Sequence, residues 1–143
     1  MLKKNLVVLD TNVIIRFLIG DNEELYEKSV RIFSEIENDR VKAVVLESVI
    51  AETVFVLEKV YRVERNLIAE LLIKILDLKG VRNGSRQIYR RALETYQAKN
   101  IDIVDCLICA HSVVGEMEVV SFDKDIETCR KLLTLSQSKV SNL

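Results

Sequence analysis

The chain has 143 residues, of which 49% are apolar and 30% charged, and this composition excludes a disordered or collagen-like chain. Its 21 basic and 22 acidic residues nearly cancel, so the whole chain is not a polybasic nucleic-acid binder. Two domains of about 70 residues each would have marginal cores. We therefore predict a single domain over residues 1–143, with its core at about 5–132 and a tail at 133–143.

The predicted elements alternate between short apolar strands and longer amphipathic helices. In chain order they are strand 6–9, helix 12–18 ending before Gly20, a helix capped by Asp21, strand 43–46, helix 48–61, helix 64–79 ending at Gly80, helices 86–98 and 103–114, strand 119–122, and a short helix from Asp125 to Leu132. Apolar strands separated by helices predict a mainly parallel sheet covered on both faces. The expected fold class is α/β, a three-layer α/β/α sandwich.

The chain offers no run of 18 uncharged apolar residues, so we expect no membrane helix. It contains three cysteines, and an odd number argues against the disulfide framework of a small secreted protein. The sequence therefore predicts a cytoplasmic protein.

Four acidic residues stand apart because apolar residues flank them. Asp10 and Asp123 follow the first and last predicted strands, while Glu52 and Asp105 fall in the first turns of helices. All four can face the edge where parallel strands end, the usual ligand site of open α/β sheets. A single acid at such a position is more often a helix cap, but four converging carboxylates would repel one another without a cation. Oxygen ligands select Mg²⁺ or Mn²⁺, so we predict a site for one of these ions.

The same residues resemble the motifs of the PIN-domain family, and most closely its VapC-type ribonuclease toxins. The motifs are Asp10-Thr11-Asn12, Glu52 in its helix, Asp105 before Cys-Leu-Ile-Cys-Ala, and Ser121-Phe122-Asp123-Lys124-Asp125. The resemblance implies a PIN-like fold and an endoribonuclease dependent on Mg²⁺ or Mn²⁺. Its catalytic and metal-ligand residues would be Asp10, Glu52, Asp105 and Asp123, supported by Asn12, Ser121 and Asp125. It also implies a homodimer and a small antitoxin whose C-terminal segment enters the acidic rim.

The helix predicted at 64–79 is apolar over a wider face than one core contact requires. With the preceding helix, it predicts a surface for self-association or for a partner peptide. The family's closing edge strand has only a poor match at 132–135.

Basic residues are concentrated at 82–99, which holds five basic residues and one acidic residue. Arg86 and Arg90 from this segment, together with Arg16, are candidate RNA contacts, because arginine side chains bind phosphates. A solvated helix face explains the same residues equally well.

Three alternatives compete with the ribonuclease interpretation. A non-catalytic PIN-like module would use the fold to bind RNA or protein. A phosphohydrolase is disfavoured because position 12 is Asn rather than a second acid. A zinc site of Cys106, Cys109, His111 and Cys129 is disfavoured because His111 projects away from the face that the two helical cysteines share, so we interpret the cysteines as helix-packing residues.

Overall fold

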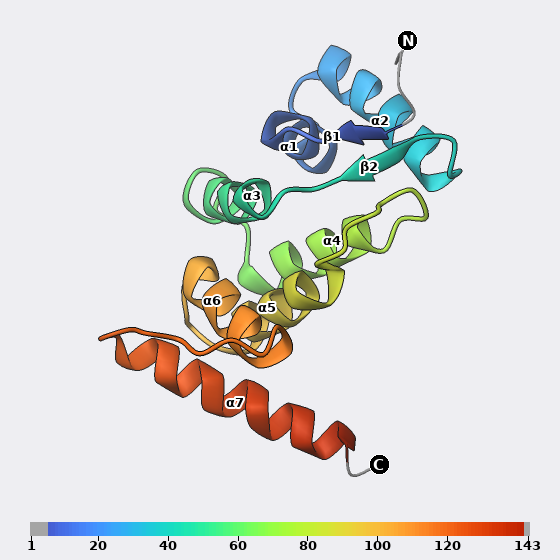
Figure 1. The fold of residues 1–143 in the computed structure, drawn as a ribbon. Coiled ribbons are helices and arrows are strands. Elements are labelled where there is room, and N and C mark those ends of the chain that lie inside the picture. Colours follow the sequence, from blue (N-terminus) through green and yellow to red (C-terminus); the bar gives the residue numbers. More distant parts are fainter. Residues whose placement is uncertain (1–5, 142–143) are drawn as a thin grey trace. The chain divides into compact units, whose positions relative to one another are not determined.

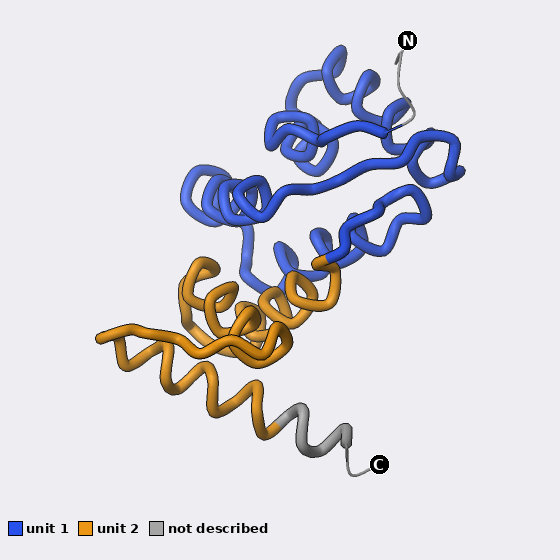
Figure 2. Tube along the Cα trace, in the orientation of Figure 1, with its two compact units in different colours: residues 1–84 blue, residues 85–143 orange. Residues whose placement is uncertain are grey.

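The computed structural model describes the secondary structure of residues 6–141 and the side chains of residues 6–135. The chain divides into two compact units, residues 1–84 and 85–143 (Figure 2). The elements, shown in Figure 1, are β1 (Leu6–Val8), α1 (Thr11–Ile19), α2 (Glu23–Glu37), β2 (Lys42–Val44), α3 (Glu47–Lys59), α4 (Arg65–Leu76), α5 (Arg86–Ala98), α6 (Ile103–Val114) and α7 (Lys124–Ser141). Within the described part of the chain, no helix is both long and apolar enough to cross a membrane.

A small parallel sheet organises the first unit. Strands β1 and β2 pair with Val7 opposite Ala43, as their continuous apolar sequences predict. On the other side of β2, Val81 forms an isolated parallel bridge with Ala43. The backbone N–H of Ala43 donates to Gly80 at 2.7 Å, and its carbonyl accepts from Arg82 at 2.8 Å. The segment after α4 therefore begins a third strand that the apolar pattern did not predict.

One side chain extends this incomplete third strand. The backbone N–H of Val45 donates to Asn83 Oδ1 at 3.0 Å, and Asn83 Nδ2 donates to the Val45 carbonyl at 2.6 Å. The Asn83 amide thus supplies both hydrogen bonds that a neighbouring strand would give, and two backbone groups at the buried Val45 are satisfied.

Gly80 has a different role from the predicted helix cap. Within the described residues, Gly20 is the glycine with a left-handed backbone, at φ 69°, where it ends α1. A Cβ added at Gly80 would lie 2.3 Å from the Val41 carbonyl oxygen and 2.6 Å from that of Ile36. Gly80 is therefore required by close backbone packing beside β2.

The first unit buries its core between the sheet and helices α1 to α4. Asn22, rather than the predicted Asp21, caps α2 by accepting a hydrogen bond from the Leu25 N–H at 3.0 Å. Asp21 instead accepts from Arg16 at 2.9 Å. The buried apolar side chains include Ile14, Phe33, Ile36, Ala43, Val45, Ile50, Val54, Leu57, Ile68 and Leu72.

Helices α5, α6 and α7 form the second unit, in which α6 packs against both of the others. The buried core includes Leu93, Tyr96, Cys106, Cys109 and Cys129, and all three cysteines are free. The Cys109 thiol donates to the Ile126 carbonyl at 3.2 Å, so it links α6 to α7. These contacts are the helix packing predicted for the cysteines.

The structure confirms an α/β fold with a parallel sheet, but it shows two strands in the described range and does not establish a three-layer sandwich. The strand predicted at 119–122 is wrong there, since this segment forms no ladder and leaves Val120 and Phe122 exposed. An apolar run becomes a strand only when its backbone finds a partner. The predicted 125–132 helix is longer than expected: α7 begins at Lys124 and continues to Ser141, because no Gly or Pro interrupts residues 133–141.

Candidate metal centre

Three carboxylates of the second unit lie together. Asp105, Asp123 and Asp125 each offer one oxygen, and these oxygens lie within 4.8 Å of one another. Asp105 comes from the first turn of α6, Asp123 precedes α7, and Asp125 lies in the first turn of α7. We call these three residues the aspartate cluster. The two predicted members are Asp105 and Asp123, whereas Asp125 was expected only as a supporting residue.

Local hydrogen bonds fix the chain on both sides of Asp123. The Asp123 N–H donates to Ser121 Oγ at 3.0 Å, and the Asp125 N–H donates to Asp123 Oδ1 at 2.9 Å. Short polar side chains favour such turns because they bond to the backbone two residues on. Ser121 therefore supports the loop that carries Asp123, and Asp123 itself orients the start of α7.

Negative charge is not balanced by a cation in this cluster. Burial raises the pKa of Asp105, and the neighbouring charges of Asp123, Asp102 and Asp125 raise it further. Asp105 is half-buried, while Asp123 and Asp125 are exposed. Among the described side chains, no ion pair holds any of the three carboxylates. The donor set is entirely oxygen, which fits a hard divalent cation such as Mg²⁺ or Mn²⁺.

The other two predicted ligands belong to the first unit. Asp10 caps α1 by accepting from the Asn12 N–H at 3.4 Å. Glu52 lies on α3, where the 3.6-residue period turns Ile50, Val54 and Leu57 inward. Asp10 and Glu52 are both exposed. Their participation with Asp105 and Asp123 stays a prediction.

Two of the three predicted RNA contacts carry ion pairs. Arg16 Nη1 lies 2.9 Å from Asp21 Oδ1, and Arg90 Nε lies 3.3 Å from Glu94 Oε1. Arg86 is half-buried at the start of α5. A phosphate would have to compete with the partners of Arg16 and Arg90. The solvated-face interpretation stays open for all three arginines.

The three cysteines lie in the buried core of the second unit. Burial raises the pKa of Cys109, and a hydrogen bond with Cys106 followed by burial raises that of Cys129. Raised pKa values keep both thiols protonated at neutral pH. The cysteines therefore belong to the core that supports α6.

Asp125, expected as a supporting residue, lies in the aspartate cluster itself. Its position two residues after Asp123 matches a loop-to-helix turn, in which both side chains can face the same point. Asp102, at the N-terminal end of α6, also contributes its charge to the raised pKa of Asp105.

Comparison with known proteins places the chain in a family. The PIN domain family model matches residues 7–132. The chain is similar to the VapC ribonuclease of Aquifex aeolicus (strain VF5), with 33% identity over 118 residues that cover 82% of this chain and 87% of the relative. No solved structure matches the chain. This chain therefore belongs to the PIN-domain family and, within it, to the VapC-type ribonucleases.

Proposed function

We propose that this VapC-type endoribonuclease of a toxin–antitoxin pair hydrolyses RNA with Mg²⁺ or Mn²⁺ bound at the aspartate cluster. The observation that carries the proposal is the meeting of Asp105, Asp123 and Asp125 without a cationic partner in the described structure. Carboxylates in such a cluster repel one another, and a divalent cation relieves this repulsion. The family relationship to a VapC ribonuclease supports RNA as the substrate.

We assign the metal ligands by their attachment to the fold. Asp105 lies on α6, which packs against both α5 and α7. Asp123 is oriented by the hydrogen bond that its Oδ1 accepts from the Asp125 N–H. When bound, the ion supplies Lewis-acid stabilisation of the phosphodiester and lowers the pKa of a water ligand. Asp10 and Glu52 are further candidates to bind the ion or to accept the proton of the attacking water. Asn12 is proposed to support Asp10, whose side chain already accepts from the Asn12 N–H.

The proposed partners are a small antitoxin and a second copy of the chain, in the cytoplasm. Helix α4, expected to provide a partner surface, lines a cavity of about 780 Å³ together with α1 and α2. Apolar side chains from all three helices reach this cavity, among them Phe17, Val30 and Leu71. Light scattering at tens of micromolar tests the dimer, and a monomer there would contradict it.

The test of the proposed function is cleavage of single-stranded RNA by the purified chain. We expect cleavage with millimolar Mn²⁺ or Mg²⁺ and none after chelation with EDTA. The Asp125→Asn variant should lose most of the activity, whereas Glu127→Gln, which changes a neighbouring exposed acid on α7, should retain it. Absence of metal-dependent cleavage by the parent would favour the non-catalytic binding module instead.

A further inference from the structure

The buried hydroxyl of Ser112 joins three parts of the second unit. Ser112 lies near the end of α6 and is 6% exposed. Its Oγ donates to the Met117 carbonyl at 2.6 Å and accepts from Arg130 Nε at 3.1 Å. The Met117 N–H in turn donates to the Ser112 carbonyl at 3.0 Å. Ser112 therefore connects α6 to the loop that follows it and to α7.

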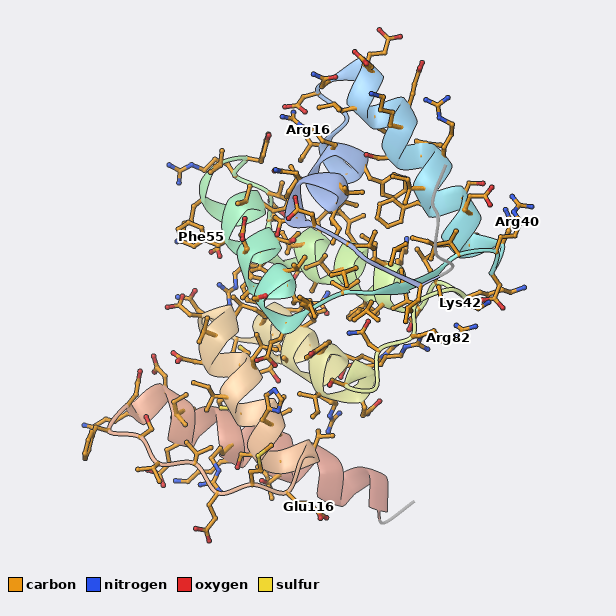
Figure 3. The ribbon with its side chains drawn as sticks, turned by 45° about the horizontal axis from the view of Figure 1, so that its top comes forward. Arg16, Arg40, Lys42, Phe55, Arg82 and Glu116 are labelled. Atoms are coloured by element: carbon orange, nitrogen blue, oxygen red, sulfur yellow. The ribbon has the colours of Figure 1, made fainter. Side chains whose placement is uncertain are left out.

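The loop at 115–123 leads from α6 to α7 and ends at Asp123 of the aspartate cluster. Glu116, labelled in Figure 3, has φ 55°, a left-handed conformation that a residue with a Cβ rarely adopts. The two hydrogen bonds at Met117 hold this turn. In the described structure, residues 118–122 make no hydrogen bond to either helix. The loop is therefore anchored at Met117 on one side and at Asp123 on the other.

Arg130 attaches α7 to the same hydroxyl that holds the loop. Ser112 follows Asp105 by seven residues, which is about two turns of α6. Arg130 follows Asp125 by five residues, which is somewhat more than one turn of α7. The hydrogen bond between Ser112 and Arg130 thus lies one to two turns behind the aspartate cluster. Because Met117 and Arg130 both bond to Ser112 Oγ, the loop and α7 are held at one point of α6.

Packing of the two helices does not itself require this hydroxyl. Ile126, Cys129 and Leu133 of α7 are already buried, and hydrophobic contacts of this kind have no preferred direction. A buried hydroxyl that is hydrogen-bonded adds little net stability, because the bonds mainly repay the loss of water. Hydrogen bonds are directional, however, and they fix how far α7 is shifted along α6. The contribution of Ser112 is therefore mainly to position.

We infer that Ser112 is a positioning residue for the candidate metal site: through Met117 and Arg130 it fixes the loop and α7, so that the aspartate cluster keeps the spacing that a divalent cation requires. The inference rests on the proposed function, because it concerns the same site. Metal-binding side chains must be held to within about 0.5 Å of their working geometry. Loss of the groups that orient metal ligands typically weakens metal binding about 10- to 100-fold.

The experiment measures Mn²⁺ binding to the full chain through the electron paramagnetic resonance signal of free Mn²⁺, at a temperature where circular dichroism shows every variant folded. Ser112→Ala should raise the Kd for Mn²⁺ roughly tenfold, with the same amount of Mn²⁺ bound at saturation. Arg130→Lys keeps the positive charge but places a methylene where Nε donates, so it should raise the Kd by a smaller factor. The double variant should bind like Ser112→Ala, because both changes remove the same hydrogen bond.

Matched controls come from the first unit. Ser29 is 4% exposed, and its Oγ donates to the Leu25 carbonyl at 2.8 Å. Ser29→Ala should lower the melting temperature in EDTA about as much as Ser112→Ala, but it should leave the Kd for Mn²⁺ unchanged. Arg40→Lys alters an arginine that pairs with Glu35 at 2.9 Å and should also leave the Kd unchanged. A purely structural role of Ser112 would lower the melting temperature without raising the Kd.

The outcomes separate this inference from the proposed function. If Asp123→Asn loses Mn²⁺ binding but Ser112→Ala and Arg130→Lys bind Mn²⁺ like the controls, the inference is wrong and the proposed metal site stands. If the parent binds no Mn²⁺, or if Asp123→Asn binds it as tightly as the parent, the proposed metal site fails and the inference fails with it.

Discussion

Asp39 and Asp105 show two opposite ways of holding a carboxylate. Asp39, in the first unit, lies 2.6 Å from Lys42 Nζ and 2.7 Å from Arg82 Nη2, and these partners hold its pKa below the ordinary value. Figure 3 labels the two cations, Lys42 and Arg82. Asp105, in the second unit, has Asp123, Asp102 and Asp125 as neighbours, and its pKa is raised. Ionisation of Asp39 therefore favours the folded protein, whereas ionisation of Asp105 opposes it.

The difference separates structural acids from acids available for function. A carboxylate that ties β2 to the segment after α4 is already satisfied by cations. A carboxylate surrounded by other carboxylates experiences electrostatic repulsion, and only protonation or a bound external cation relieves it. The same reasoning applies to Glu35, whose pKa is lowered by its hydrogen bonds from Arg40.

The largest expected effect is on catalysis. Replacing Asp105 or Asp123 by Asn should lower RNA cleavage with Mn²⁺ at least about a hundredfold, because metal ligands act as a unit. Asp39→Asn should leave cleavage within a few-fold of the parent. Initial rates on a single-stranded RNA measure both. Equal losses in all three variants would mean that the two classes of acid do not differ in function.

The next effect is on metal-dependent stability. At a Mn²⁺ concentration of 100 times Kd, binding should stabilise the parent by about 2.7 kcal/mol. Thermal melting with and without Mn²⁺ should show this shift in the parent and in Asp39→Asn. It should be much smaller in Asp105→Asn and Asp123→Asn. An unchanged shift in these two variants would place the ion elsewhere.

A smaller effect should appear without metal as the pH changes. Because the pKa of Asp105 is higher in the folded protein than in the unfolded chain, the unfolded chain ionises first as the pH rises, and stability falls until the pH exceeds the folded pKa. Asp105→Asn should therefore melt above the parent at pH 7 in EDTA. The difference should vanish below about pH 4, where the unfolded aspartate is also protonated. A variant that melts below the parent at pH 7 would show that Asp105 is a structural acid.

The smallest effect concerns Asp39. Its lowered pKa gives stability that is present above the unfolded pKa and is lost as the pH falls through the folded pKa. Asp39→Asn should lower the melting temperature slightly at pH 7, since exposed ion pairs contribute little. High salt should shrink the difference from the parent. An increase in melting temperature would contradict the role assigned to Lys42 and Arg82.

Local signals in the sequence predicted the helices well. Gly20 predicted the end of α1, and the helices predicted at 86–98 and 103–114 agree with the bounds of α5 and α6. The start of α2 was misplaced by one residue, because both Asp21 and Asn22 can cap a helix and the choice depends on Arg16, which pairs with Asp21.

Strands were harder to predict, because pairing involves distant residues. Residues 119–122 have strand-like composition but no ladder in the described structure, whereas Val81 reaches β2 after a helix and a turn. The role of Gly80 was hidden for the same reason, since the carbonyls that exclude a side chain there belong to Val41 and Ile36.

The candidate site was predicted in part. Asp105 and Asp123 are marked by nearby apolar residues and by their positions next to helix starts, and the structure brings these two carboxylates together. Asp125 joins the cluster because of a turn, in which its N–H donates a hydrogen bond to Asp123 Oδ1. The sequence did not predict this turn.

The Asn83 amide that completes the sheet has a consequence for the chemical ageing of the protein. Asn83 is followed by Gly84, and an Asn-Gly bond is prone to deamidation because glycine leaves the attacking backbone nitrogen unhindered. Both ends of the Asn83 amide are engaged by Val45, so the reaction is held back while the fold is intact. Deamidation would replace the donor to the Val45 carbonyl with a negative charge. Each unfolding event therefore exposes Asn83 to irreversible deamidation. Mass spectrometry of heated samples should detect deamidation at Asn83 before any other asparagine.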